Sequence, residues 1–272
     1  MSTAALTTDL RLPSAGSTAL RAAAGLWFVV AVIGQWAFVY YIVAFYGPST
    51  LTGNFQAWSR NKLLFKGYVP GDTAGNLFFA AHVLLAAVVT LGGTLQLVPQ
   101  IRARALAFHR WNGRLFLLTA MVTALAGLYM TLLGGRRGKS LDGTVASTLN
   151  ALLIFVFAAL AWRSARARDV AAHRRWALRA YLVANGVWFI RVGFMAWALV
   201  SHGRGISSFF RVWDFGCYLV PLAVLELYLR ARDRGGAGGR FAMAGGLIAL
   251  TGLMGLGMVA LYLGMWRPLL RR

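Results

Sequence analysis

Seven long apolar runs constrain this chain more than any other feature of its sequence. A helix needs about 20 mostly apolar residues to cross the hydrocarbon core of a bilayer. The chain is 59% hydrophobic and only 13% charged, whereas a soluble domain carries about 25% charged residues. The sequence therefore predicts an all-α integral membrane protein with a polar N-terminal tail at 1–22 and a single transmembrane domain at 23–272. The expected spans are 23–46, 77–98, 115–134, 147–162, 180–201, 212–229 and 241–266.

The chain has a net charge of +21, and most of its arginines lie in the segments between the apolar runs. This placement favours lipid over nucleic acid as the partner of the basic residues. With seven spans, one side of the membrane holds 16 Lys and Arg and the other holds 11. The positive-inside rule then predicts a multi-pass protein of the inner (plasma) membrane of a bacterium, with its N-terminus in the cytoplasm and its C-terminus outside.

A basic phrase occurs twice, as RARALAFHR at 102–110 and as RARDVAAHR at 166–174, with six of nine positions identical. Each copy precedes an apolar run, which suggests a parallel duplication of the hairpins formed by spans two and three and spans four and five. His109 and His173 occupy the same place in the two copies, although the chain has only four histidines.

Three interpretations of this phrase stay open. Arginine and tryptophan commonly anchor helices at the membrane interface. Alternatively, His109 and His173 are axial ligands of one haem b, with Arg110, Arg174 and Arg114 binding its propionates. In the third interpretation, the His-Arg pairs bind another anion, such as a lipid phosphate or an acidic metabolite.

The other two histidines, His82 and His202, fall toward the opposite side of the membrane. A second haem needs ligands there, so His82 is a further candidate for binding haem iron. The alternative is a core histidine that is hydrogen-bonded to a neighbouring carboxylate, and His202 is expected to lie in a loop.

Charged residues also fall inside two of the expected spans. Arg191 lies near the middle of span five, and span six offers Asp214 and Glu226 as partners at similar depth. An intramembrane ionisable residue is by default a candidate functional site. The alternatives are a buried ion pair between spans five and six and a binding or protonation site, with Asp214 also a candidate hydrogen-bond acceptor for His82.

Several classes of enzyme are disfavoured. The sequence has no Gly-x-Ser-x-Gly, P-loop or His-Glu-x-x-His motif. Its seven acidic residues offer almost no pair for hydrolysis, and the single cysteine, Cys217, excludes an internal disulfide. If the protein is an enzyme, it is a membrane redox protein.

The segments AAHVLLAAVVTLGGTLQLVPQIR, HRWNGRLFLL, HRRWALRAYL and FGCYLVPLAVLEL resemble the bacterial membrane family known as domain of unknown function 2306. The resemblance covers about residues 77–230, and Phe116 stands where the family usually has tyrosine. It implies a polytopic bacterial membrane protein without implying an activity. The matching positions are His82, Gln96, His109, Arg110, Gly113, Arg114, His173, Arg174, Trp176, Arg191 and Glu226.

Three functions remain after this reading. The first is haem b binding and membrane electron transfer through paired histidines. The second is transport or sensing of a small acidic or lipidic ligand by intramembrane Arg, Glu and His. The third is a structural or assembly subunit, and the sequence leaves the oligomeric state open.

Overall fold

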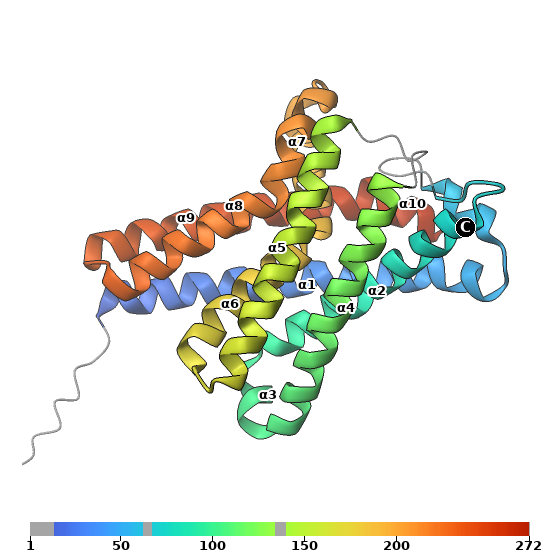
Figure 1. Cartoon of the computed structure of the whole chain (residues 1–272). Coiled ribbons are helices and arrows are strands. Elements are labelled where there is room, and N and C mark those ends of the chain that lie inside the picture. The colour runs from blue at the N-terminus through green and yellow to red at the C-terminus, as the bar shows by residue number, and fades with distance from the viewer. Residues whose placement is uncertain (1–13, 62–66, 134–139, 272) are drawn as a thin grey trace, which may run out of the picture.

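The computed structural model describes residues 14–61, 67–133 and 140–271, and its regular elements are all helices (Figure 1). Six helices are long and apolar enough to cross a membrane. The prediction of an all-α polytopic membrane protein is therefore confirmed. The six are α1 (Ala15–Leu51), α2 (Thr73–Leu97), α4 (Leu106–Leu132), α5 (Leu141–Arg166), α8 (Ile206–Arg234) and α9 (Ala237–Leu261), which continues through η2 (Tyr262–Trp266) into α10 (Arg267–Leu270).

The fifth expected span is not one continuous helix. The region expected to be one helix at 180–201 belongs to α6 (Val170–Ala184) and α7 (Gly186–Ser201), which meet at an angle of 55°. The Asn185 side chain donates to the Tyr181 carbonyl, 2.9 Å away, and so competes with the helical backbone. Glycine next to it has a low helix propensity, so the pair Asn185-Gly186 accounts for a break that was not predicted.

The first helix begins earlier than predicted. Ser14 accepts a hydrogen bond from the Ser17 backbone N–H and so caps α1, a usual role for serine. Residues 15–22, assigned to a polar tail, are therefore helical. Their apolar side packs on α9, where Leu20 and Ala23 meet Ala244 and Leu247.

Two short helices complete the chain. The loop expected at 47–76 contains η1 (Phe55–Arg60), and Asn61 after it donates to the hydroxyls of Tyr41 and Tyr46 at 2.9 and 3.0 Å. This loop is therefore tied to α1. The second short helix, α3 (Pro99–Arg104), connects α2 to α4.

The long helices diverge at one end of the molecule. In Figure 1, α8 and α9 run beside α1, whereas α3 and α6 lie below them. The closest pairings are α2 with α4, α1 with α9 and α5 with α6. A cavity between these helices is lined by residues of α1, α8 and α9 and by residues of α3 and α6.

Candidate functional site

The two copies of the basic phrase adopt the same local structure. Each begins at the end of one helix, crosses a short break and enters the next helix, α4 or α6. His109 and His173 are both the fourth residue of the new helix, and each donates its backbone N–H to a carbonyl four residues earlier, at 2.9 Å. The repeated sequence thus produces a repeated placement of histidine.

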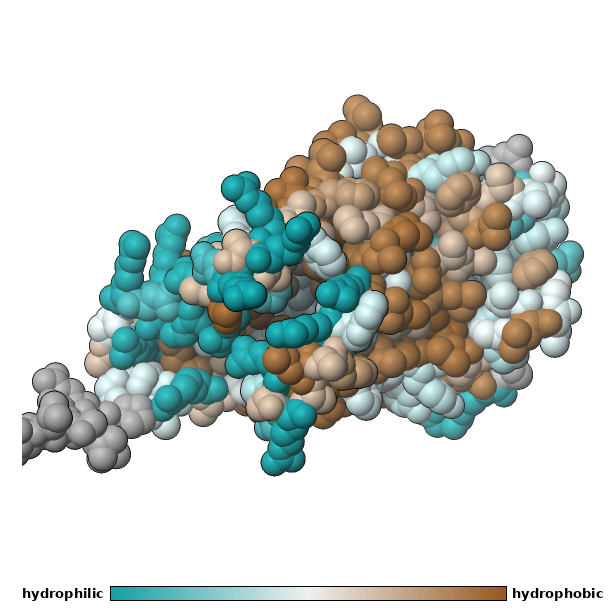
Figure 2. All heavy atoms as spheres, turned by 60° about the horizontal axis from the view of Figure 1, so that its bottom comes forward, coloured by the Kyte–Doolittle hydropathy of each residue, from teal (hydrophilic) through white to brown (hydrophobic). Residues whose placement is uncertain are grey.

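Both histidines line a single cavity of about 910 Å³ between the helices. Its walls come from α1 to α9, and most of its lining is apolar. Figure 2 shows hydrophilic side chains gathered around a hollow, beside a broad hydrophobic surface. We define the basic end of the cavity by the five arginines that line it: Arg102, Arg110, Arg168, Arg174 and Arg232.

The charges around the cavity are unbalanced. Five arginines and two histidines line it, and no acidic side chain of the described residues does. Arg232 is paired with Asp233 at 2.8 Å, and the other four arginines are exposed. Like charges gathered in one place repel one another. An anion placed at the basic end relieves this repulsion, and guanidinium groups bind phosphate and carboxylate with paired hydrogen bonds.

The two imidazoles differ in their contacts. His173 directs Nδ1 at the carbonyl of Ala161 on α5, 2.9 Å away, which makes Nδ1 the protonated nitrogen and Nε2 the one able to accept or ligate. His109 has a buried Nδ1 without a hydrogen-bond partner among the described residues. Both histidines line the same cavity, so the structure brings together the pair expected from the sequence.

Residues of the first phrase fix α4 against α2. Gln96 donates to the His109 carbonyl at 2.9 Å, and Asn112 donates to the Gly92 carbonyl at 2.8 Å. A Cβ at Gly113 would lie 3.1 Å from the Gln96 side-chain oxygen. Gln96 and Gly113 therefore position His109 by helix packing, and both also line the cavity.

Residues just after the phrases face away from the cavity. Arg114, expected to bind a cofactor, lies 4.7 Å over the ring of Trp111, which is 68% exposed. This exposed stacking is typical of an interface anchor. Trp176 stacks on Phe157 and carries Arg179 over its ring. These residues follow the phrases and do not line the cavity, whereas Arg110 and Arg174, within the phrases, do.

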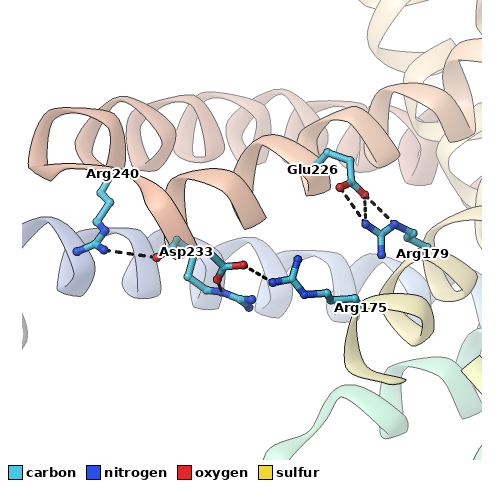
Figure 3. A network of polar contacts seen from close by, with 6 residues as sticks. Arg175, Arg179, Glu226, Asp233 and Arg240 are labelled. Atoms are coloured by element: carbon cyan, nitrogen blue, oxygen red, sulfur yellow. Dashed lines mark hydrogen bonds and ion pairs between the residues drawn. The ribbon is translucent and has the colours of Figure 1, made fainter. Parts of the chain in front are cut away.

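Glu226 has a different partner from the one expected. It accepts two hydrogen bonds from Arg179, at 2.8 and 2.9 Å, and so joins α8 to α6 rather than pairing with Arg191. One turn away on α6, Arg175 binds Asp233. Figure 3 shows both arginines reaching from α6 to α8. Of the two carboxylates that the sequence offers to Arg191, Glu226 is therefore bound by Arg179.

Arg191 is buried and turned toward α1. Its guanidinium lies 5.1 Å from the ring centroid of Phe38 and donates to the Val187 carbonyl at 2.7 Å. Tyr41 and Tyr46 are its electrostatic neighbours. Arg191 is 6% exposed and does not line the cavity. Asp214 lies on α8 beside Cys217, whose thiol donates to the Asp214 carbonyl.

The remaining histidines lie apart from the cavity. His82 on α2 directs Nδ1 at the Thr123 carbonyl of α4, 2.9 Å away, and packs over Gly127. A backbone carbonyl is thus the partner of this nitrogen. His202 is exposed and ends α7 in the left-handed conformation. Among the described residues, no three His, Cys, Asp or Glu side chains gather closely enough to hold a metal ion.

Several residues of the site were not predicted. Arg102, Arg168 and Arg232 reach the cavity from helix ends that the sequence marks only as basic. Tyr181 lines the cavity and donates to the buried Gln35 side chain of α1 at 2.6 Å. A polar residue inside an apolar run was the available signal for Gln35.

Comparison with known proteins gives one match. The family model described as predicted membrane protein DUF2306 matches residues 79–229, which include both basic phrases, Arg191 and Glu226. No curated protein and no solved structure matches the chain. The matched segment is more than half of the 272 residues, and the chain therefore belongs to the DUF2306 family of predicted membrane proteins.

Proposed function

We propose that this protein binds an amphipathic anion inside the membrane, as a transporter or sensor of that ligand. The observation that carries the proposal is the cavity, which has five arginines and two histidines at one end of an apolar lining and no acidic side chain among its described lining residues. Its volume of about 910 Å³ falls within the range of roughly 300 to 1,000 Å³ found for small-molecule sites.

The roles of the residues follow from their chemistry. Arg110 and Arg174 hold the anionic group, since guanidinium binds phosphate and carboxylate in a planar, two-pronged geometry. His109 and His173 sit beside them and donate further hydrogen bonds when protonated. The apolar walls bury the rest of the ligand away from water. The arginines select for ligands that carry an anionic group.

A second candidate function is haem b binding with membrane electron transfer. The two imidazoles in one cavity favour it, together with the hydrogen bond that fixes His173 Nδ1 on Ala161. His109 and His173 would ligate the iron, and Arg110 and Arg174 would bind the propionates. A haem with two histidine ligands supplies one-electron transfer when it is bound.

One preparation distinguishes these candidates. The full-length protein is purified in mild detergent from haem-replete cells, its spectrum is recorded before and after dithionite, and its solvent extract is analysed by mass spectrometry. A b-type spectrum that disappears in His109→Ala and His173→Ala, but persists in the control His202→Ala, supports haem. A colourless protein that carries an amphipathic anion, lost in Arg110→Gln with Arg174→Gln, supports the first proposal. A protein with neither ligand contradicts both and leaves a structural subunit.

A further inference from the structure

The length of the cavity narrows the class of ligand. Its lining residues on α8 run from Arg232 at the basic end to Phe209. These residues are 23 positions apart, which is about 35 Å along a helix, whereas the hydrocarbon core of a bilayer is about 30 Å thick. On α7 the lining likewise extends from Phe189 to Val200, close to the end of that helix. The lining residues therefore extend along most of α7 and α8.

The chemistry of the lining changes along this length. The five arginines and both histidines lie near helix ends, within 102–110 and 168–174 and at Arg232. We define the far end by Trp197, Val200, Phe209 and Trp213, where Phe209 stacks on the rings of both Trp197 and Trp213. The rest of the lining is mostly apolar and includes Val220, Leu250 and Leu253 together with aromatic residues such as Phe116. One end thus suits an anionic group, and the remainder suits hydrocarbon.

A glycine on α7 allows a tryptophan of α8 to pack closely at the far end. Trp213 lies against Gly193 of α7, where a Cβ would come within 2.2 Å of the indole, and its Nε1 donates to the Phe189 carbonyl at 3.3 Å. Glycine at this position is what allows α7 and α8 to approach with the indole between them. The far end is therefore a defined apolar wall that begins after the break between α6 and α7.

We infer that the ligand is a long-chain lipid anion, with its phosphate or carboxylate at the basic end and one hydrocarbon chain lying along α7, α8 and α9 toward the far end. This inference rests on the proposed binding of an amphipathic anion. A compact anion would contact the basic end alone and would leave the aliphatic and aromatic walls without a partner. A lipid whose chain spans the hydrocarbon core matches both the length and the change in polarity.

The test compares ligands of different chain length with variants at the two ends. Hexadecyl phosphate, butyl phosphate and palmitate are titrated into the full-length protein in nanodiscs, and Kd is measured by thermophoresis. Leu253→Trp fills the middle of the cavity, and Leu256→Trp is its control, because both residues are about half exposed on α9 but only Leu253 lines the cavity. On α4, Arg110→Gln removes an arginine of the basic end, and Arg114→Gln is its control because Arg114 does not line the cavity. Hexadecyl phosphate against palmitate tells whether the headgroup is a phosphate or a carboxylate.

We expect Leu253→Trp to weaken the binding of the long-chain ligand at least tenfold and to leave butyl phosphate unchanged, with no effect of Leu256→Trp. Val220→Trp gives an independent block from α8 if Leu253→Trp does not fold. Equal binding of hexadecyl phosphate by the wild-type protein, Leu253→Trp and Val220→Trp would overturn the long-chain inference. The proposed function would still be supported in that case if Arg110→Gln lost the binding of both hexadecyl phosphate and butyl phosphate. No effect of Arg110→Gln on either ligand would contradict the proposed function itself.

Discussion

The guanidinium of Arg179 binds both carboxylate oxygens of Glu226, and this pair joins α6 to α8 at the edge of the cavity. Two turns before Arg179 on α6 lies His173, and neighbours of Glu226 on α8, including Leu225, line the cavity. The ion pair therefore holds together two walls of the site. Glu226 is also one of the two carboxylates that the sequence suggests as partners of Arg191.

Removing this carboxylate should destabilise the protein measurably. Glu226→Gln keeps the size of the side chain but loses a two-pronged, charge-assisted contact, so we expect the free energy of unfolding to fall by about 1 kcal/mol. Thermal unfolding of the detergent-solubilised protein would check this value. Arg175→Gln, which loses the more exposed pair with Asp233, should have a smaller effect. An equal or larger loss in Arg175→Gln would contradict the assignment.

Gly93 should tolerate no side chain. A Cβ there would lie 2.9 Å from the ring of Phe116 and 3.0 Å from that of Tyr181. Tyr181 is held by its hydrogen bond to Gln35, and overpacking a core typically costs about 1–3 kcal/mol. Gly93→Ala should therefore lower the melting temperature clearly. Gly245→Ala is the control, because open space surrounds that glycine, and a fall in melting temperature as large as that of Gly93→Ala would refute this packing argument.

Arginine and lysine should not be interchangeable at position 191. The guanidinium stacks on Phe38 and donates to the Val187 carbonyl, and a lysine ammonium lacks the planar group for both contacts. We expect Arg191→Lys to destabilise the protein by roughly 1–2 kcal/mol. Arg114→Lys alters an exposed stacking on Trp111 and should change stability by less than about 0.5 kcal/mol. Unfolding curves that show an equal loss of stability in Arg191→Lys and Arg114→Lys would contradict the role of the buried Arg191 contacts.

Local patterns in the sequence predicted the helices well, because membrane spans leave a long apolar signal. The same signal hid the break at Asn185, since the residues on both sides of Asn185-Gly186 are mostly apolar. The repeated phrase predicted a matching placement of His109 and His173, and each is the fourth residue of the helix that follows its break, α4 or α6.

Pairings between distant helices were harder to predict. Depth in the membrane allowed Arg191 and Glu226 to meet, but the rotation of α7 about its axis turns Arg191 toward Phe38 of α1. Arg179, only a little further along the phrase than His173, takes Glu226 instead. The cavity itself also left no signal in the sequence, since its lining comes from nine helices whose divergence is a property of tertiary packing.

The central claim is that the basic end of the cavity binds an amphipathic anion. Its most direct test is the change in melting temperature of the full-length protein when hexadecyl phosphate is added, since a ligand of the native state stabilises it. We predict a rise for wild-type protein and for the control pair Arg114→Gln with Arg175→Gln, whose side chains lie outside the cavity lining, and no rise for Arg110→Gln with Arg174→Gln. An equal rise in all three proteins, or no rise in wild-type protein, would contradict the claim.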